Sequence, residues 1–315
     1  MSTFILRKER TFGQKVEATF EFIRLTRKPL FKSMLFFTAP FVLIGTFVVA
    51  NVFSRISAIA VNTGEGLGAS EGDLMSIGLS VFGLAFLLIF AGTMVVSVVF
   101  ATMRIYEGQD NADFTHKQVW KMIGKVYWPI FGSVFLHSTV IGILYLLSLI
   151  PIGIIMQISP FLALPLIYLF LGFCGVVAFT ALSNQILDRH NIGKSVSVAF
   201  KLLKNNWWAS LGLFLVLMII YNVVRLIFLL PIYVSTILQS LFVVETGSFE
   251  IPLWQEMLNY ILGGIFLVGS FFSYMIPLVG MNLQFFSMSE AKDAKTLIKR
   301  IDNLGESQEE EEEDY

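Results

Sequence analysis

Residues 127–183 read YWPIFGSVFLHSTVIGILYLLSLIPIGIIMQISPFLALPLIYLFLGFCGVVAFTALS, and this stretch contains no Asp, Glu, Lys or Arg. As one helix it would be about 85 Å long, far more than the roughly 30 Å hydrocarbon core of a bilayer. Pro151 and Pro160 bracket its middle, and proline interrupts helices. The stretch therefore predicts two membrane-spanning helices, Trp128–Ile150 and Phe161–Ser183, joined by a tight turn of about ten residues.

Four further segments are as apolar and as long, since a spanning helix needs about 20 mostly apolar residues. They are Met34–Phe53, Leu74–Met103, Trp208–Leu230 and Asn259–Phe286. Pro231 follows the fifth span, and the next residues, Ile232–Val244, are too few to cross again. They are predicted to form either a kinked extension of that span or an interfacial helix.

The composition places the chain among integral membrane proteins. Hydrophobic residues make up 56% and charged residues 14% of the 315, whereas a soluble domain carries about 25% charged residues. No Asp or Glu lies between Phe114 and Leu187, or between Arg189 and Val244. Such stretches are typical of membrane-embedded chain, because an ionised group at the bilayer centre costs roughly 2.5–3.5 kcal/mol.

The distribution of Lys and Arg predicts the orientation of the spans. Twenty of these residues flank the spans on one face, and Arg55 alone lies on the other. Because short cytoplasmic loops are enriched in Lys and Arg, both termini are predicted to be cytoplasmic. The opposite face has two short, acidic loops, which contain Glu65, Glu71, Asp73, Glu245, Glu250 and Glu256.

These patterns divide the chain into three parts. Residues 1–33 are expected to be a cytoplasmic amphipathic N-terminal segment, and residues 34–286 a six-helix transmembrane domain. Residues 287–315 are expected to be a cytoplasmic tail, disordered because of its acidic run Glu309–Asp314.

An internal repeat precedes the odd-numbered spans. Residues 11–28 read TFGQKVEATFEFIRLTRK and residues 191–208 read NIGKSVSVAFKLLKNNWW, so that Gly13, Val16 and Phe20 match Gly193, Val196 and Phe200 at an offset of 180. A weaker copy, at an offset of 100, precedes Trp128.

Each copy alternates apolar and basic residues at helical spacing. Val16, Phe20 and Ile23 share one helical face, away from Lys15 and Arg24, which is typical of an amphipathic helix in the headgroup region. The predicted fold class is an all-α membrane protein. Its six transmembrane helices form three hairpins, each preceded by a cytoplasmic amphipathic interfacial helix.

Two segments carry a resemblance to a known family. FEFIRLTRKPL at 20–30 and VAFKLLKNNWWA at 198–209 resemble the repeated cytoplasmic segment of the membrane-domain family of glycerophosphoryl diester phosphodiesterases. Its members are bacterial polytopic proteins of largely unknown function. The resemblance implies a multi-pass protein of the plasma (inner) membrane of a bacterium. Some relatives carry a phosphodiesterase barrel after the membrane part. Only about 29 residues follow the last span here, so we expect no catalytic domain.

Two ionisable residues within the spans are candidate functional residues. Arg225 is the only formal charge inside a predicted span, about 25 Å along the helix from Trp208. It is predicted either to reach outward to lipid phosphate or the acidic loops, or to contact a functional anion or lipid headgroup. His137 lies about 13 Å into the third span, and no carboxylate is available there for a proton relay. A neutral histidine hydrogen-bonded to a hydroxyl or amide is therefore expected.

Uncharged polar residues in the spans are predicted to join helices. Hydrocarbon penalises unpaired amides, so interhelical hydrogen bonds are expected for Asn51, Asn222, Asn282 and Gln284. Gly269, Ser273 and Pro277 recur every four residues, which indicates either a close-packing face or the wall of a substrate path.

No phosphate-binding loop, nucleophile elbow, zinc motif or pair of intramembrane acids is recognisable. We therefore expect no enzyme activity, no cofactor, no metal site and no nucleic-acid binding. The favoured function is a non-catalytic scaffold, assembly or regulatory component of the cell envelope, whose partners are the lipid bilayer and another membrane protein. The alternative is a transporter or lipid-handling protein with Arg225 and His137 in its path.

Overall fold

The computed structural model describes residues 4–64, 71–109, 114–246 and 253–293, and these form α-helices and short connections without any strand. The helices in chain order are α1 (Phe12–Leu25), α2 (Arg27–Gly64), α3 (Glu71–Gln109), α4 (His116–Ile158), α5 (Pro160–Leu187), α6 (Ile192–Leu203), α7 (Trp207–Thr246) and α8 (Leu253–Asp293). The carboxylates predicted for the acidic loops and the acidic tail lie outside the residues whose side chains are described.

Six of the described helices are long and apolar enough to cross a membrane, which confirms the predicted number. The qualifying stretches are Arg27–Val48, Leu74–Gln109, His116–Gln157, Pro165–Leu187, Trp207–Leu238 and Leu253–Lys292. Five of the six are longer than predicted, because the helices continue past the predicted bounds of the spans.

The ten-residue turn predicted between Pro151 and Pro160 is wrong. α4 continues through Pro151 to Ile158, and only Ser159 separates it from α5. Proline within a membrane helix bends it more often than it ends it. The break occurs at Ser159, which is extended (φ −157°, ψ 105°), because the residue before a proline avoids the helical region and proline is well placed at a helix start. Pro231 likewise does not end α7, so Ile232–Val244 continues α7, the helix of the fifth span.

The segments predicted to be interfacial helices differ from one another. α1 and α6 are separate helices, whereas residues 116–127 form the first part of the continuous α4. α1 buries Ala18, Thr19 and Phe22. Val16 and Ile23 pack against the same core, but Phe20, predicted on their face, is exposed. α6 buries one face, packed against α5. Both helices therefore cover protein as well as facing outward.

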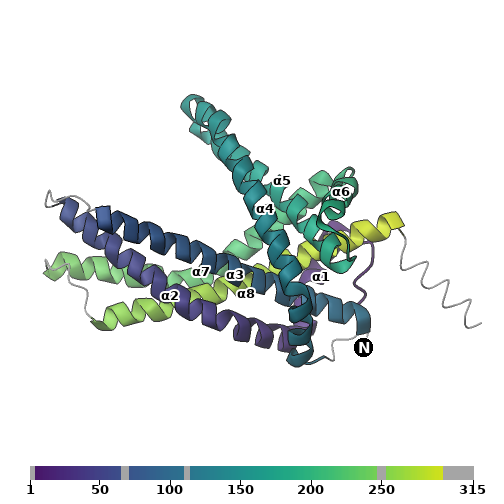
Figure 1. Ribbon diagram of the computed structural model, residues 1–315, viewed down its shortest axis with the longest axis horizontal. Helices are drawn as coiled ribbons and strands as arrows, with labels where there is room; N and C mark the ends of the chain where they lie inside the picture. Colours follow the sequence, from purple (N-terminus) through teal and green to yellow (C-terminus); the bar gives the residue numbers. More distant parts are fainter. Residues whose placement is uncertain (1–3, 65–70, 110–113, 247–252, 294–315) are drawn as a thin grey trace, which may run out of the picture.

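α8 is the central helix of the bundle (Figure 1). It packs against α7, α2, α1, α5 and α3, and its residues Met275–Ser289 are buried. α2 also packs along α3, and α4 along α5. The segment before α1 belongs to this core, since Phe4 and Leu6 are buried and the Phe4 ring lies 5.8 Å from that of Phe22.

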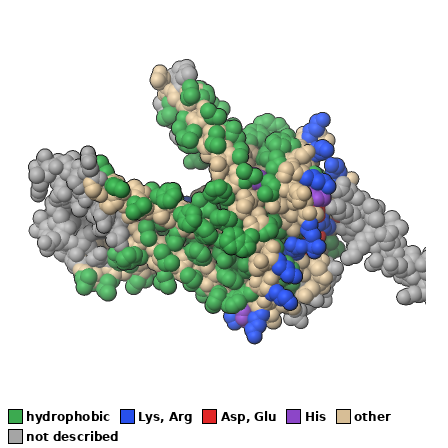
Figure 2. Space-filling model, viewed as in Figure 1, with side chains coloured by type: hydrophobic (Ala, Val, Ile, Leu, Met, Phe, Trp, Pro, Cys, Tyr) green, Lys and Arg blue, Asp and Glu red, His purple; other side chains and the backbone are tan. Residues whose placement is uncertain are grey.

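Exposed basic side chains gather at the end of the bundle that holds α1 and α6 (Figures 1 and 2). We call this the basic end; it includes the exposed residues Lys28, Lys32, Lys117, Lys121, Lys125, Lys194, Lys201 and Lys204. Figure 2 shows these charges as one band beside a broad hydrophobic surface. The band is what the predicted clustering of Lys and Arg on one face requires.

α4 and α5 together form an arm whose tip, where α4 meets α5, stands apart from the other long helices (Figures 1 and 2), while nearer the basic end α4 packs against α3 and α5 against α8. In the most hydrophobic stretch of α4, 6% of the residues are buried, against 33% in that of α5 and 50% in that of α3. Large apolar side chains are exposed along the arm: Leu146, Leu147, Ile150, Phe161 and Tyr168. The arm is joined to the rest of the molecule at its base, near the basic end.

Candidate functional site

Arg225 lies on α7, 18 residues after its first residue, and thus about 27 Å along the helix. The guanidinium carbon is 5.0 Å from the ring centroid of Phe266 on α8. Its Nε is buried and has no hydrogen-bond partner among the described residues, and no described carboxylate forms an ion pair with it. A cation–π contact of this kind is worth about 0.5–2 kcal/mol. Arg225 is therefore held by an aromatic ring.

His137 lies on the α4 arm and is bonded within its own helix. Its Nδ1 is 2.7 Å from the backbone carbonyl oxygen of Ser133 and 3.2 Å from the Ser133 hydroxyl. The carbonyl can only accept, so the short contact places a proton on Nδ1. In the neutral ring, Nε2 then carries a lone pair and no proton. This buried atom has no hydrogen-bond partner in the described part of the chain.

The structure does not bring Arg225 and His137 together. They lie on α7 and α4, and no hydrogen bond or ion pair among the described residues joins them or links either to a carboxylate. Within the same residues, no group of three or more His, Cys, Asp or Glu side chains is arranged to hold a metal ion. Arg225 and His137 are thus two separate features.

The membrane amides behave in two ways. Asn282 on α8 accepts a hydrogen bond of 2.7 Å from the Ser183 hydroxyl on α5, and Gln284 donates one of 2.8 Å to Ser210 on α7. These two predictions of interhelical bonds are confirmed. The prediction for Asn222 is wrong, because its amide donates to the Met218 carbonyl one turn earlier in α7. Asn51 lies among residues whose side chains are not described.

An ion-pair cluster that the sequence analysis missed lies at the basic end. Arg7, in the segment before α1, donates from Nε to Glu107 of α3 at 2.6 Å and from Nη2 to Asp188 at 2.8 Å. Asp188 caps the C-terminus of α5. The Arg7 guanidinium carbon also lies 4.8 Å from the ring centroid of Phe286 on α8. One side chain thus connects the N-terminal segment with three helices.

The charges of this cluster support one another. Burial alone would lower the pKa of Arg7, but the negative charges of Glu107 and Asp188 outweigh it and raise the pKa above its ordinary value. The side chains of the three residues are 14–28% exposed, so water screens the pairs only in part. By contrast, burial lowers the pKa of the nearby Arg10.

One sequence signal could have pointed to this cluster. Asp188 is the only carboxylate between Asp113 and Glu245, in a chain segment that otherwise excludes acids. An isolated acid beside basic residues is a candidate ion-pair partner. Its actual partner is 181 residues away in sequence, and no local pattern indicates a contact over that separation.

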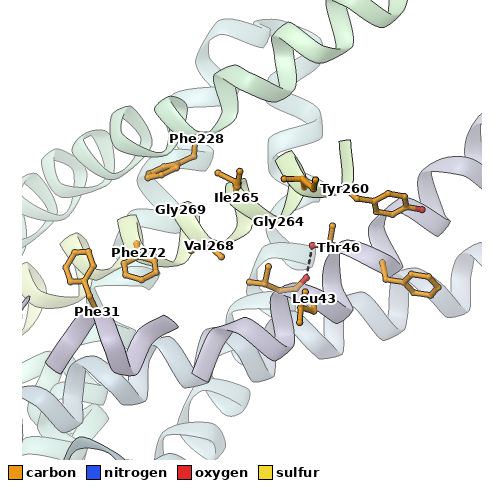
Figure 3. Close-up of a pocket in the computed structure, with 13 residues that line it drawn as sticks. Phe31, Leu43, Thr46, Phe228, Tyr260, Gly264, Ile265, Val268, Gly269 and Phe272 are labelled. Carbon is orange, nitrogen blue, oxygen red and sulfur yellow. Dashed lines mark hydrogen bonds between the residues drawn. The ribbon is translucent and has the colours of Figure 1, made fainter. Parts of the chain in front are cut away.

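A second feature, an apolar groove of about 760 Å³, runs between α2, α7 and α8 (Figure 3). Gly264 and Gly269 of α8 form part of its wall, with Leu43 of α2 and Phe228 of α7 on either side. The Phe31 and Phe272 rings, with centroids 4.9 Å apart, meet at the end of the groove nearest the basic end.

The small-residue stripe of α8 contributes to both packing and groove. A Cβ added at Gly269 would overlap the Phe228 ring, so glycine here lets α7 approach α8 closely. Among the described lining residues, only Thr46 and Tyr260 carry hydroxyls, and Thr46 donates to the Val42 carbonyl at 2.7 Å. Neither Arg225 nor His137 lines the groove. The described part of its wall is thus predominantly apolar.

Comparison of the chain with family models, with curated proteins and with solved structures gives no match in any of the three.

Proposed function

We propose that the protein is a non-catalytic integral membrane protein of the bacterial inner membrane that serves as a scaffold, assembly or regulatory component of the cell envelope. The observation that supports this most directly is the α4–α5 arm, because only 6% of the residues in the most hydrophobic stretch of α4 are buried. The outer part of the arm gains little packing from its own bundle, and a helix of another membrane protein would supply that packing.

The surface of the arm has features of a helix-docking face. Ser138 and Gly142 are exposed and one turn apart, and a Cβ added at Gly142 would meet nothing within 4 Å. Small residues at this spacing allow a neighbouring helix to approach closely, which is the main source of helix association in lipid.

We further propose a membrane topology of three hairpins, α2–α3, α4–α5 and α7–α8, with both termini cytoplasmic. The band of basic side chains at one end of the bundle supports this orientation. An internal repeat is supported by the helix bounds, since α1 and α2 start at Phe12 and Arg27, and α6 and α7 start 180 residues later, at Ile192 and Trp207. The resemblance to the phosphodiesterase membrane-domain family stays a prediction.

The docking role is tested by copurification from a mild detergent. A Gly142→Trp variant places a bulky ring on the proposed face, and Val140→Trp places it about 200° away on the same exposed helix. We expect the wild type and Val140→Trp to copurify with a membrane protein in fixed stoichiometry, and Gly142→Trp to lose it. Recovery of the wild type alone as a monodisperse particle, or equal binding by both variants, would contradict the proposal.

A second candidate function is lipid handling, which the apolar groove favours. Arg225 and His137 do not support it as a pair, since they lie on different helices and outside that groove.

A further inference from the structure

We propose that the groove between α2, α7 and α8 binds an anionic phospholipid from the leaflet next to the basic end, with an acyl chain in the groove and the phosphate held by Lys28 and Lys32. The described residues of α4 and α5 do not line this groove. The proposed site is therefore independent of the partner-docking role of the arm.

The dimensions of the groove fit a hydrocarbon chain. Along α2 it extends from Phe31 to Phe47, which is about 24 Å at 1.5 Å per residue. An extended acyl chain, which the surrounding bilayer supplies, can lie along a groove of this length.

The chemistry of the groove wall also favours an acyl chain as the occupant. The side chains described along it are apolar except for Thr46 and Tyr260, and the Thr46 hydroxyl is already used within α2. Water and ions find few polar contacts on such a surface, whereas a hydrocarbon chain needs none. The groove lies within the stretches of α2, α7 and α8 that are apolar enough to span a membrane, where acyl chains surround it.

Two lysines at one end of the groove favour an anionic headgroup. Lys28 and Lys32 lie within one turn of Phe31, which lines that end of the groove. At 100° per residue, Lys28, Lys32 and the groove-lining Thr46 lie within about 40° of one another around α2. Both lysines are exposed and neither forms an ion pair with a described carboxylate. They offer two positive charges where the groove meets the headgroup layer.

The test is native mass spectrometry of the full-length protein titrated with phosphatidylglycerol or phosphatidylcholine of identical acyl chains. We expect tighter binding of phosphatidylglycerol by the wild type. The Lys28→Gln/Lys32→Gln variant should bind phosphatidylglycerol roughly thirtyfold more weakly, since each lysine near an anionic headgroup contributes about a factor of five. The control, Lys201→Gln/Lys204→Gln, removes two exposed lysines at the end of α6 and should bind as the wild type does.

A second pair of variants tests the acyl-chain site. Ile265→Trp fills the groove, whereas Ile227→Trp adds the same ring at an exposed position of α7 outside its lining. We expect Ile265→Trp to weaken the binding of both lipids and Ile227→Trp to leave it unchanged. Both variants should give size-exclusion profiles like that of the wild type. Equal binding of the two lipids by the wild type would overturn the proposal. So would equal weakening by both lysine pairs, which indicates general attraction to the basic end, or unchanged binding by Ile265→Trp.

Discussion

Arg7 and Glu107 lie 100 residues apart in sequence, yet Nε of the first is 2.6 Å from the carboxylate of the second. The same guanidinium reaches Asp188 and the Phe286 ring. The segment before α1 is thereby attached to the ends of α3 and α5 and to α8. Contacts between distant helices of this kind determine how the bundle closes at its basic end.

Arg7→Gln is expected to lower the free energy of unfolding by about 1–3 kcal/mol, because it removes the cation that contacts both partly buried carboxylates. Lys8→Gln, at the exposed neighbouring position, should change it by less than about 0.5 kcal/mol. The measurement is denaturant unfolding in detergent. A cation whose pKa is raised in the folded state contributes its full stabilisation below its unfolded-state pKa. That stabilisation is lost only as the pH rises through the folded-state pKa. The Arg7 contribution should thus be equal at about pH 6 and about pH 9.

Two glycines should respond to alanine with opposite signs. A Cβ at the buried Gly280 of α8 would overlap Leu217 of α7 and lie 3.0 Å from the Thr19 hydroxyl of α1, so Gly280→Ala should destabilise by about 1–3 kcal/mol. Gly124 of α4 is exposed with nothing within 4 Å, and Gly124→Ala should stabilise by about 0.5–1 kcal/mol through helix propensity. Thermal unfolding of both variants measures this, and a shared sign would contradict the packing of α1, α7 and α8.

Arg225→Met should leave stability within about 1 kcal/mol of wild type. The variant loses the cation–π contact with Phe266 but also removes a charge without an acidic partner among the described residues, and methionine still packs on an aromatic ring. Arg225→Met and His137→Ala should each leave transbilayer lipid movement in proteoliposomes unchanged. A clear fall in that movement for either variant would instead favour the lipid-handling function through these residues.

The proposed orientation predicts the reactivity of single cysteines. In a Cys174→Ser background the chain has no other cysteine, so Lys204→Cys and Trp254→Cys each provide one exposed site, at the basic end and near the start of α8. An impermeant thiol reagent added to intact cells should label Trp254→Cys, and should label Lys204→Cys only after permeabilisation. The reverse pattern would invert the topology.

Several elements were predictable because their cause is local. The lengths of the apolar segments in the chain predict six spanning helices, and the alternation of apolar and basic residues predicts separate helices at α1 and α6. The prolines were a poorer guide, since Pro151 and Pro231 lie inside continuous helices while the break occurs at Ser159. A proline's effect in lipid depends on which neighbours satisfy the freed carbonyl, and that is not a local property.

The sequence by itself determined that the protein lies in lipid, because its apolar segments are long enough to span a bilayer and its basic residues are gathered at the ends of these segments. Only the tertiary structure decided that α8 is central, that Arg7 reaches Glu107 and Asp188, and that three helices leave a groove beside Gly264. The reason is physical, since hydropathy acts on each residue separately. Packing in lipid depends instead on which small and large side chains meet across helices far apart in the chain.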